Sequence, residues 1–273
     1  MQLLDFPADA VTNIDTEVIS QAKQSRGTID SLVARSTNPV KPNMKDRPDH
    51  RQQILAAPFF DGLPEDAIQQ AIAKVVVREH PPHQGILLEE DWGNSVYFVL
   101  SGWVKIRIYN YGKEVTLNIL GKGEMFGEMS ALDRLTRSAD VITLTQATIA
   151  SLPAPEFVHL VETEHKACIR LARLMAKRLR QVNRRLRLRG SDSRSRVADV
   201  LLFLVEGQGT EGSAGIEIPN LPHKELSSLS GLARETVTRV LGKLESKNLI
   251  HRDTARNILC IPNVKGLQDI IDE

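Results

Sequence analysis

The sequence is poor in cysteine and has no long apolar run, and both absences exclude whole classes of protein. Its two cysteines, Cys168 and Cys260, are too few for a disulfide framework and cannot supply a four-cysteine iron–sulfur site. Such sparse cysteine usage favours the reducing cytoplasm. No segment offers the roughly 20 consecutive apolar residues of a membrane helix, so no membrane partner is expected.

The chain also lacks a secretory signal and a strong excess of charge. Its first residues, MQLLDFPADAVTNID, contain no basic start followed by an apolar core. Because 35 basic and 34 acidic residues give a net charge of +1, any binding to nucleic acid must come from local charge. With 273 residues, 41% of them hydrophobic, the chain is long enough for two domains with their own cores.

Catalytic motifs are missing from the sequence as well. It has no Ser/His/Asp arrangement, no metal-ligand spacing and no P-loop, so we predict no enzyme, no catalytic residue and no metal, haem or iron–sulfur cluster. His80 and His83, in the run His-Pro-Pro-His, leave a haem sensor as an alternative, although solvated histidines explain such a run more often.

Three segments of different character precede a long helix. Residues 1–48 are polar and without pattern, which predicts a flexible arm, with one helix over 15–35 as the alternative. Residues 51–74 indicate two short helices, the second beginning after Pro64. From Val75 to Leu152 apolar residues alternate with polar ones between glycine turns, which predicts many short strands in a closed or double-sheet arrangement.

A long helix is predicted from about Glu164 to Arg189. Apolar residues recur along it in alternating steps of four and three, which is the spacing of a coiled-coil seam and favours a parallel dimer. A single helix packed on its own domain would give a similar pattern. The seam positions are Cys168, Ala172, Met175, Leu179, Val182 and Leu186.

Positive charge is concentrated at the end of this helix. Between Lys166 and Arg196 twelve basic residues face one acid, Asp192, so this segment could contact DNA phosphates, although cations also accumulate at helix C-termini. The run Gly190-Ser191-Asp192-Ser193 predicts a helix end followed by a new N-cap, and therefore a hinge.

The segment 223–250 has the pattern of a helix-turn-helix. A short helix with Leu226 and Leu229 on its inner face precedes Gly231, and a second helix over 233–246 has inner positions at Val237, Leu241 and Leu244. Two short apolar runs around a polar turn, 249–261, add a predicted β-hairpin wing. The other face of the second helix presents charged and polar residues that could enter the major groove.

Three of these features together resemble one family. They are the segment GKGEMFGEMSALDRLTRSADV over 121–141, the long helix after the β region, and the run Ala-Arg-Glu-Thr-Val-Thr-Arg over 233–239 with its wing. In this order they are similar to the cAMP receptor protein/FNR transcription factors of bacteria. The similarity covers roughly residues 50–265, and the long N-terminal arm is extra.

The resemblance implies an α+β architecture. Its parts would be an N-terminal arm (1–48), a cyclic-nucleotide-binding β-roll of the double-stranded β-helix or jelly-roll type (49–163), a dimerisation helix (164–190) and a C-terminal winged helix-turn-helix (191–273). It further implies a cytoplasmic homodimer that binds double-stranded DNA at a near-palindromic site with half-sites ~34 Å apart, with RNA polymerase as a further partner.

The segment after Phe126 matches the family's phosphate-binding cassette. A cyclic phosphate is a small anion, to which Arg137 can donate two parallel hydrogen bonds, with Ser138 and the backbone around Met129 and Ala139 completing the site. Gly127 allows close approach of the backbone, and Glu128 can accept from a ribose hydroxyl. The alternative is that Glu128 and Arg137 merely pair with each other.

The family pattern is broken where it usually contacts the base. Val182 falls at the position of a hydroxyl residue on the dimerisation helix and cannot hydrogen-bond an adenine amino group, whereas the neighbouring Asn183 can. The effector therefore stays open at this point: cAMP, another nucleotide, another small anionic metabolite, or none.

Arg234 and Arg239 are the candidates for hydrogen bonds to guanine, and each such contact is worth about 1–3 kcal/mol against a wrong base. Glu235 is the candidate that accepts a hydrogen bond from cytosine. Their spacing resembles the family's reading of a TGTGA-type half-site. Weaker candidates for phosphate contacts are Thr236, Thr238, Lys243, His223, Lys224 and Arg252. Two rival functions remain: a nucleotide-binding module that acts on a protein partner, and a redox-sensitive regulator that uses Cys168.

Overall fold

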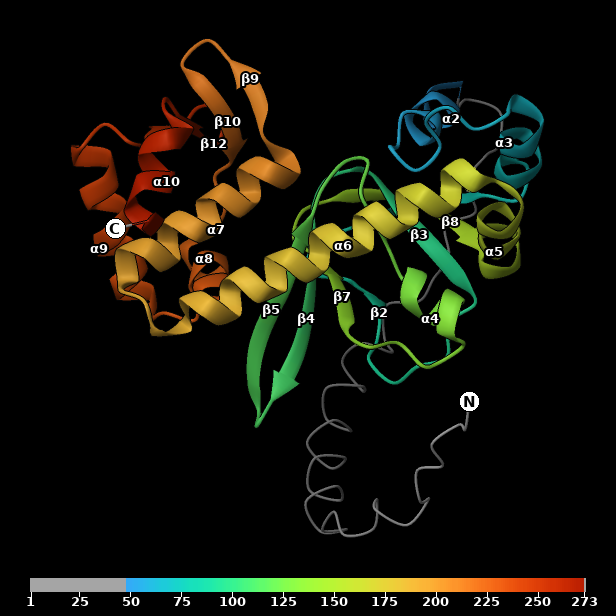
Figure 1. Cartoon of the computed structure of the whole chain (residues 1–273), viewed down its shortest axis with the longest axis horizontal. Helices are drawn as coiled ribbons and strands as arrows, with labels where there is room; N and C mark the ends of the chain where they lie inside the picture. Colours follow the sequence, from blue (N-terminus) through green and yellow to red (C-terminus); the bar gives the residue numbers. More distant parts are fainter. Residues whose placement is uncertain (1–47, 273) are drawn as a thin grey trace, which may run out of the picture. The chain divides into compact units, whose positions relative to one another are not determined.

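The structure, a computed structural model, describes residues 48–272, so the predicted N-terminal arm lies almost wholly outside the described residues. The described residues belong to one compact unit. Figure 1 shows helix α6 (His165–Arg187) running from the β-roll to the helices of the C-terminal half. Within the described residues, no helix is both long and apolar enough to cross a membrane.

The β-roll consists of two four-stranded antiparallel sheets, as the alternating sequence predicts. One sheet has the order β1 (Val76–His80), β8 (Ala147–Pro153), β3 (Ser95–Ser101), β6 (Met125–Phe126). The other has the order β2 (Gly85–Leu87), β7 (Asp140–Thr143), β4 (Val104–Asn110), β5 (Lys113–Leu120). Side chains of both sheets, including Val99, Val104 and Val141, share one buried cluster between them.

Strand β3 buries apolar side chains on both faces, because three helices cover the face of the first sheet that points away from the second sheet. They are α2 (Pro48–Leu55), α3 (Glu65–Ile72) and α5 (Ala154–Thr163). The rings of Phe60 and Phe98 lie 5.1 Å apart and those of Phe59 and Phe157 5.2 Å apart, all four being buried. This second core also holds Leu171, and so fixes the first turns of α6 to the roll.

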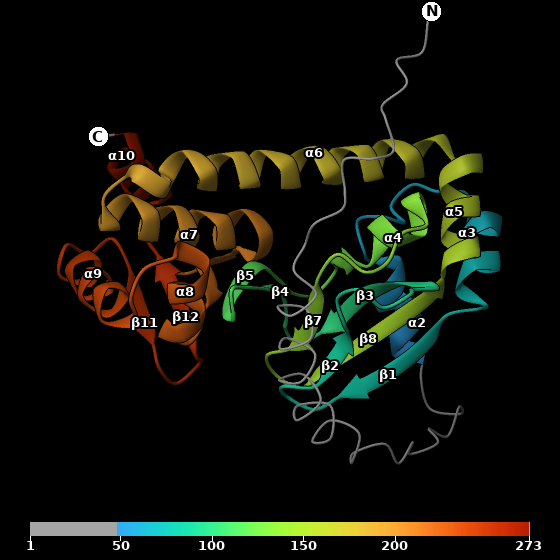
Figure 2. The ribbon, with the colours of Figure 1, turned by 90° about the horizontal axis from the view of Figure 1, so that it is seen from below.

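The predicted break after α6 is present. A short 3₁₀ turn, η2 (Leu188–Gly190), ends the helix, and α7 (Ser193–Gln208) then turns back along its end (Figure 2). Asp192 is the N-cap of α7, its Oδ1 accepting a hydrogen bond of 2.8 Å from Ser195 N. The prediction of a helix end followed by a new cap is therefore confirmed.

The C-terminal half contains the predicted helices α8 (His223–Ser230) and α9 (Arg234–Ser246) and the wing strands β11 (His251–Asp253) and β12 (Ile258–Ile261). The segment before α8 also contains β9 (Thr210–Gly212), which pairs with β10 (Gly215–Pro219) and was not predicted from the sequence. A last helix, α10 (Val264–Asp272), packs on α7 and completes the core. That core also contains Ile119, which belongs to strand β5 of the roll.

Candidate effector pocket and DNA interface

The cassette begins with a sharp turn at Gly127. This residue has φ = 78°, a left-handed conformation that glycine adopts without strain, and it starts the short helix α4 (Glu128–Asp133). A Cβ at this position would lie 2.7 Å from Arg137 Nη1, so only glycine lets the arginine approach so closely. Helix α4 was not predicted from the sequence, because six residues are too few for a helical period to be recognised.

Arg137 is buried and held against the backbone of the cassette. Its Nη1 donates to Gly127 O at 2.7 Å and to Ser130 Oγ at 2.6 Å, and its Nη2 donates to Ser95 O at 2.7 Å. Burial lowers the pKa of Arg137 from its ordinary value, against the attraction of Tyr97 and Glu128. A buried cation that has backbone partners but no ion-pair partner among the described residues is well prepared for a small anion.

Glu128 does not pair with Arg137, so the alternative of a simple ion pair between them was wrong. Its carboxylate, 2% exposed, pairs instead with Arg178 of α6. Arg178 also donates to Met125 O at 2.5 Å. An ion pair therefore connects the cassette to the long helix, and local sequence pattern could not predict it because the partners are fifty residues apart.

These side chains line a pocket of about 230 Å³ between the roll, α6 and α7. Seven of the eight predicted effector-binding residues lie in its wall: Gly127, Glu128, Met129, Arg137, Ser138, Ala139 and Val182. Asn183 does not; it lines a separate groove with Lys177 and Arg187. The wall opposite the cassette was not predicted from the sequence; it is supplied by Arg178, Gln181, Arg185 and Phe203.

The predicted seam of α6 is largely exposed in the single chain. Leu179 is 62% exposed, and Val182 and Leu186 are each 51% exposed. Cys168 and Ala172 are exposed and Met175 is half-buried. An apolar stripe open to solvent along one helix face is typical of a protein–protein contact.

The predicted DNA-reading residues lie on the outer side of α9 and its surroundings. Gly231, with φ = 64°, ends α8, and Arg196 of α7 donates to Ser230 O at 2.5 Å and to Gly231 O at 3.0 Å, which fixes the turn. Exposed side chains there are Lys224, Arg234, Glu235, Thr238, Arg239 and Lys243.

Three of the weaker phosphate candidates are partly buried: Thr236, His223 and Arg252. His223 Nδ1 lies 2.7 Å from Thr238 Oγ1, and burial, together with the charges of Arg252 and Arg234, lowers the pKa of His223. Arg252 Nε lies 3.8 Å from Glu245 Oε2. His223 and Arg252 therefore already have side-chain partners on α9, whereas Arg234 and Arg239 are exposed.

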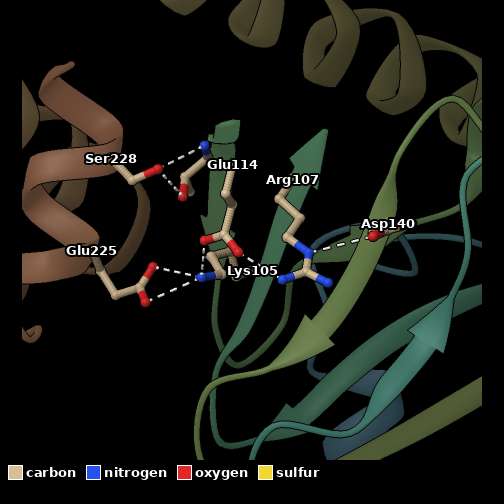
Figure 3. A network of polar contacts seen from close by, with 7 residues as sticks. Lys105, Arg107, Glu114, Asp140, Glu225 and Ser228 are labelled. Atoms are coloured by element: carbon tan, nitrogen blue, oxygen red, sulfur yellow. Dashed lines mark hydrogen bonds and ion pairs between the residues drawn. The ribbon is translucent and has the colours of Figure 1, made fainter. Parts of the chain in front are cut away.

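A polar network connects the β-roll to the helix-turn-helix (Figure 3). Lys105 Nζ lies 2.7 Å from Glu114 Oε1 and 2.9 Å from Glu225 Oε2 of α8. Ser228 of α8 is bonded to Thr116 Oγ1 at 2.8 Å and accepts a second bond from the backbone of the same threonine. We call Lys105, Arg107, Glu114, Thr116, Asp140, Glu225 and Ser228 the interdomain network.

The network reaches the cassette from its other end. Arg107 lies 2.6 Å from Glu114 and 3.3 Å from Asp140, which directly follows Ala139 of the pocket wall. Burial works to raise the pKa of Glu114, but the hydrogen bonds from Lys105 and Arg107 outweigh it, so the pKa lies below its ordinary value. The period-two pattern of 104–110 could have placed Lys105 and Arg107 on one strand face, but not their partners in α8.

Comparisons with known proteins agree with this arrangement of parts. The family model of the cyclic nucleotide-binding domain matches residues 77–164, and that of the Crp-like helix-turn-helix domain matches residues 195–270. The cyclic AMP receptor protein of Thermus thermophilus is 34% identical over 200 residues, which cover 72% of this chain and 89% of that protein. A CRP-like cAMP-activated global transcriptional regulator of Mycobacterium tuberculosis is 30% identical over 216 residues, 75% of this chain and 96% of its own length.

A solved structure of a CooA mutant from Carboxydothermus hydrogenoformans has a TM-score of 0.60 at 20% identity, covering 74% of this chain and 90% of the other, and so shares the fold. The two halves together define a transcription regulator with a cyclic-nucleotide-binding domain and a DNA-binding helix-turn-helix. The chain belongs to the Crp/Fnr family of bacterial transcription regulators.

Proposed function

We propose that this protein is a homodimeric, non-enzymatic regulator whose pocket binds a nucleotide with a cyclic phosphate and whose α9 reads DNA. The observation that carries the proposal is the buried Arg137, which lies beside Gly127 and Ser138 in a pocket closed by the long helix. A cyclic phosphate would meet the guanidinium and the Ser138 hydroxyl there, with Glu128 near the ribose. The proposed organisation keeps the boundaries expected from the sequence: roll 49–163, dimerisation helix 164–190 and winged half 191–273.

Dimerisation is proposed to use the exposed seam of α6. Replacing Leu179 with aspartate places a charge in the middle of this stripe, where a partner helix would have to bury it. We expect the L179D variant to elute as a monomer in size-exclusion chromatography with light scattering, whereas the wild type elutes as a dimer. Arg180→Asp, at an exposed neighbouring position outside the seam, is the matched control and should stay dimeric. A monomeric wild type would contradict the proposal.

DNA reading is proposed to rest on Arg239 and Arg234, with a TGTGA-type palindrome as the site. We expect Arg239→Ala to weaken binding to this palindrome by about 5- to 150-fold, since each arginine–guanine contact is worth about 1–3 kcal/mol. Fluorescence anisotropy with the palindrome and with a scrambled duplex measures the change. Binding to the scrambled duplex should change far less, and an equal loss on both would mean that Arg239 contacts only phosphate.

Effector control requires two arrangements of the helix-turn-helix between which a ligand discriminates. The pocket wall combines roll, α6 and Phe203 of α7, so a bound nucleotide contacts both halves of the chain. The same anisotropy titration, run with and without a cyclic nucleotide, tests the whole proposal: a change in DNA affinity supports it. Specific DNA binding that no nucleotide alters would instead favour an effector-independent or Cys168-dependent regulator.

A further inference from the structure

The pocket contains one more cation than a cyclic phosphate can balance. Three arginines line it, Arg137, Arg178 and Arg185, against a single carboxylate, Glu128. Arg178 is paired with Glu128, and a cyclic phosphate bound at the cassette would balance Arg137. Arg185 is attracted by Asp199, but the ion pair of Asp199 is made with Arg184. Arg185 therefore has no counter-ion of its own in the pocket wall.

Arg185 is held rigidly, with one edge of its guanidinium unused. Its Nη1 donates to Leu117 O, and its charge lies 4.2 Å from the centre of the Phe203 ring. Its Nε and Nη2 are buried and have no hydrogen-bond partner among residues 48–272. In a guanidinium group these two nitrogens carry parallel N–H groups, which match a ligand edge with two adjacent acceptor atoms.

An unused acceptor belongs to the same pocket wall. Asn118 follows Leu117 on β5, lines the pocket, and its Oδ1 is likewise buried without a partner among the described residues. Buried polar atoms without partners are rare and costly in folded proteins. The pocket wall thus combines a double donor with a single acceptor, beside the apolar side chains of Val182 and Phe203 and the amide of Gln181.

Guanine has the complementary pattern, whereas adenine does not. Guanine offers two adjacent acceptors, O6 and N7, and also carries N–H donors, while adenine offers one acceptor, N7, beside an amino donor that would face the donors of Arg185. Adenine could donate its amino group to Asn118, but then only one of the two Arg185 donors would have an acceptor on the base. We propose that this end of the pocket recognises guanine, with Arg185 donating to O6 and N7, so that the effector is a guanine-containing cyclic nucleotide. This inference rests on the proposed function, a pocket for a cyclic nucleotide.

The test is calorimetric titration of the full-length protein with cGMP, cyclic di-GMP and cAMP, each for the wild type and for Arg185→Gln. We expect the wild type to bind cGMP, cyclic di-GMP or both about 5- to 150-fold more tightly than cAMP. Arg185→Gln should lose this preference while its affinity for cAMP stays within about threefold. The two guanine ligands distinguish a cyclic mononucleotide from a cyclic dinucleotide as the source of the base.

Two further variants sharpen the result. Arg185→Lys keeps the charge but not the parallel donors, so it should also lose the preference; if it keeps it, Arg185 acts only as a charge and the assignment of guanine is overturned. Arg180→Gln, an exposed arginine of the same helix outside this pocket, should bind as the wild type does. Thermal unfolding of each variant shows that the protein is folded.

The failures are distinguishable. Wild-type protein that binds cAMP as tightly as both guanine ligands overturns the assignment of guanine and leaves the proposed function standing. An Arg185→Gln variant that weakens all three ligands equally also overturns it, because the arginine would then only support the pocket. Binding of none of the three overturns the proposed cyclic-nucleotide pocket, and this inference with it.

Discussion

Replacing Lys105 with alanine is expected to lower the free energy of unfolding by about 3–5 kcal/mol, which is the usual cost of removing one partner from a buried ion pair. Lys105 is 5% exposed and lies between Glu114 and the buried Glu225, so the variant leaves two carboxylates facing each other across the interface. Urea-induced unfolding at neutral pH measures the loss. Lys113→Ala, at an exposed position of the same hairpin, should change stability little.

Two checks separate this explanation from a mere loss of packing. A Lys105→Met/Glu225→Leu double variant removes both charges of the pair and should recover a large part of the loss. The pKa of Glu114 lies below its ordinary value of 4.5, so its ion pairs contribute stability above that pH and lose it as the pH falls further. The difference between wild type and Lys105→Ala should therefore shrink below about pH 4.5, and a constant difference would contradict the electrostatic explanation.

The second large effect is expected at the cassette. Arg137→Lys keeps the positive charge but cannot donate two parallel hydrogen bonds to a cyclic phosphate, nor hold Gly127 O and Ser95 O at the same time. Since hydrogen bonds to charged groups contribute about 1.5–3 kcal/mol, we expect the affinity for the bound nucleotide to fall by about 10- to 150-fold.

Calorimetric titration measures this change for whichever nucleotide the wild type binds, with Ser138→Ala as a milder comparison that removes one hydroxyl. The melting temperature without ligand should also fall, because the two backbone carbonyls would lose donors. If Arg137→Lys binds as tightly as the wild type, the phosphate is held elsewhere and the cassette is not the anion site.

Local pattern was enough to predict much of this fold. Apolar and polar residues alternate over 75–152, which predicts strands that bury every second side chain. The segment 223–250 predicts two helices around a glycine, and Asp192 marks a helix start. Each of these features depends on neighbours within one turn or one strand. Short elements with weak periods were missed, namely α4 and β9, the latter made of Thr210, Glu211 and Gly212.

Only the cassette wall of the effector pocket was predicted from the sequence. The cassette residues form a continuous motif, and seven of the eight predicted effector residues line the pocket. The opposite wall depends on how α6 and α7 dock, which no local pattern encodes. Arg178 and Arg185 were counted in the sequence only as members of a basic helix, where cations are common. Their burial, and the pairing of Glu128 with Arg178, follow from tertiary packing alone.

Ile119 belongs by sequence to the β-roll but is buried in the core of the winged half, and 2% of its surface is exposed. Lys105 likewise stands on a strand of the roll and is neutralised in part by α8. The two halves are therefore not interchangeable modules. A chimaera that grafts a foreign DNA-binding domain after residue 190 would expose an apolar side chain and leave a lysine without one of its acids, unless the outer faces of β4 and β5 were exchanged with it.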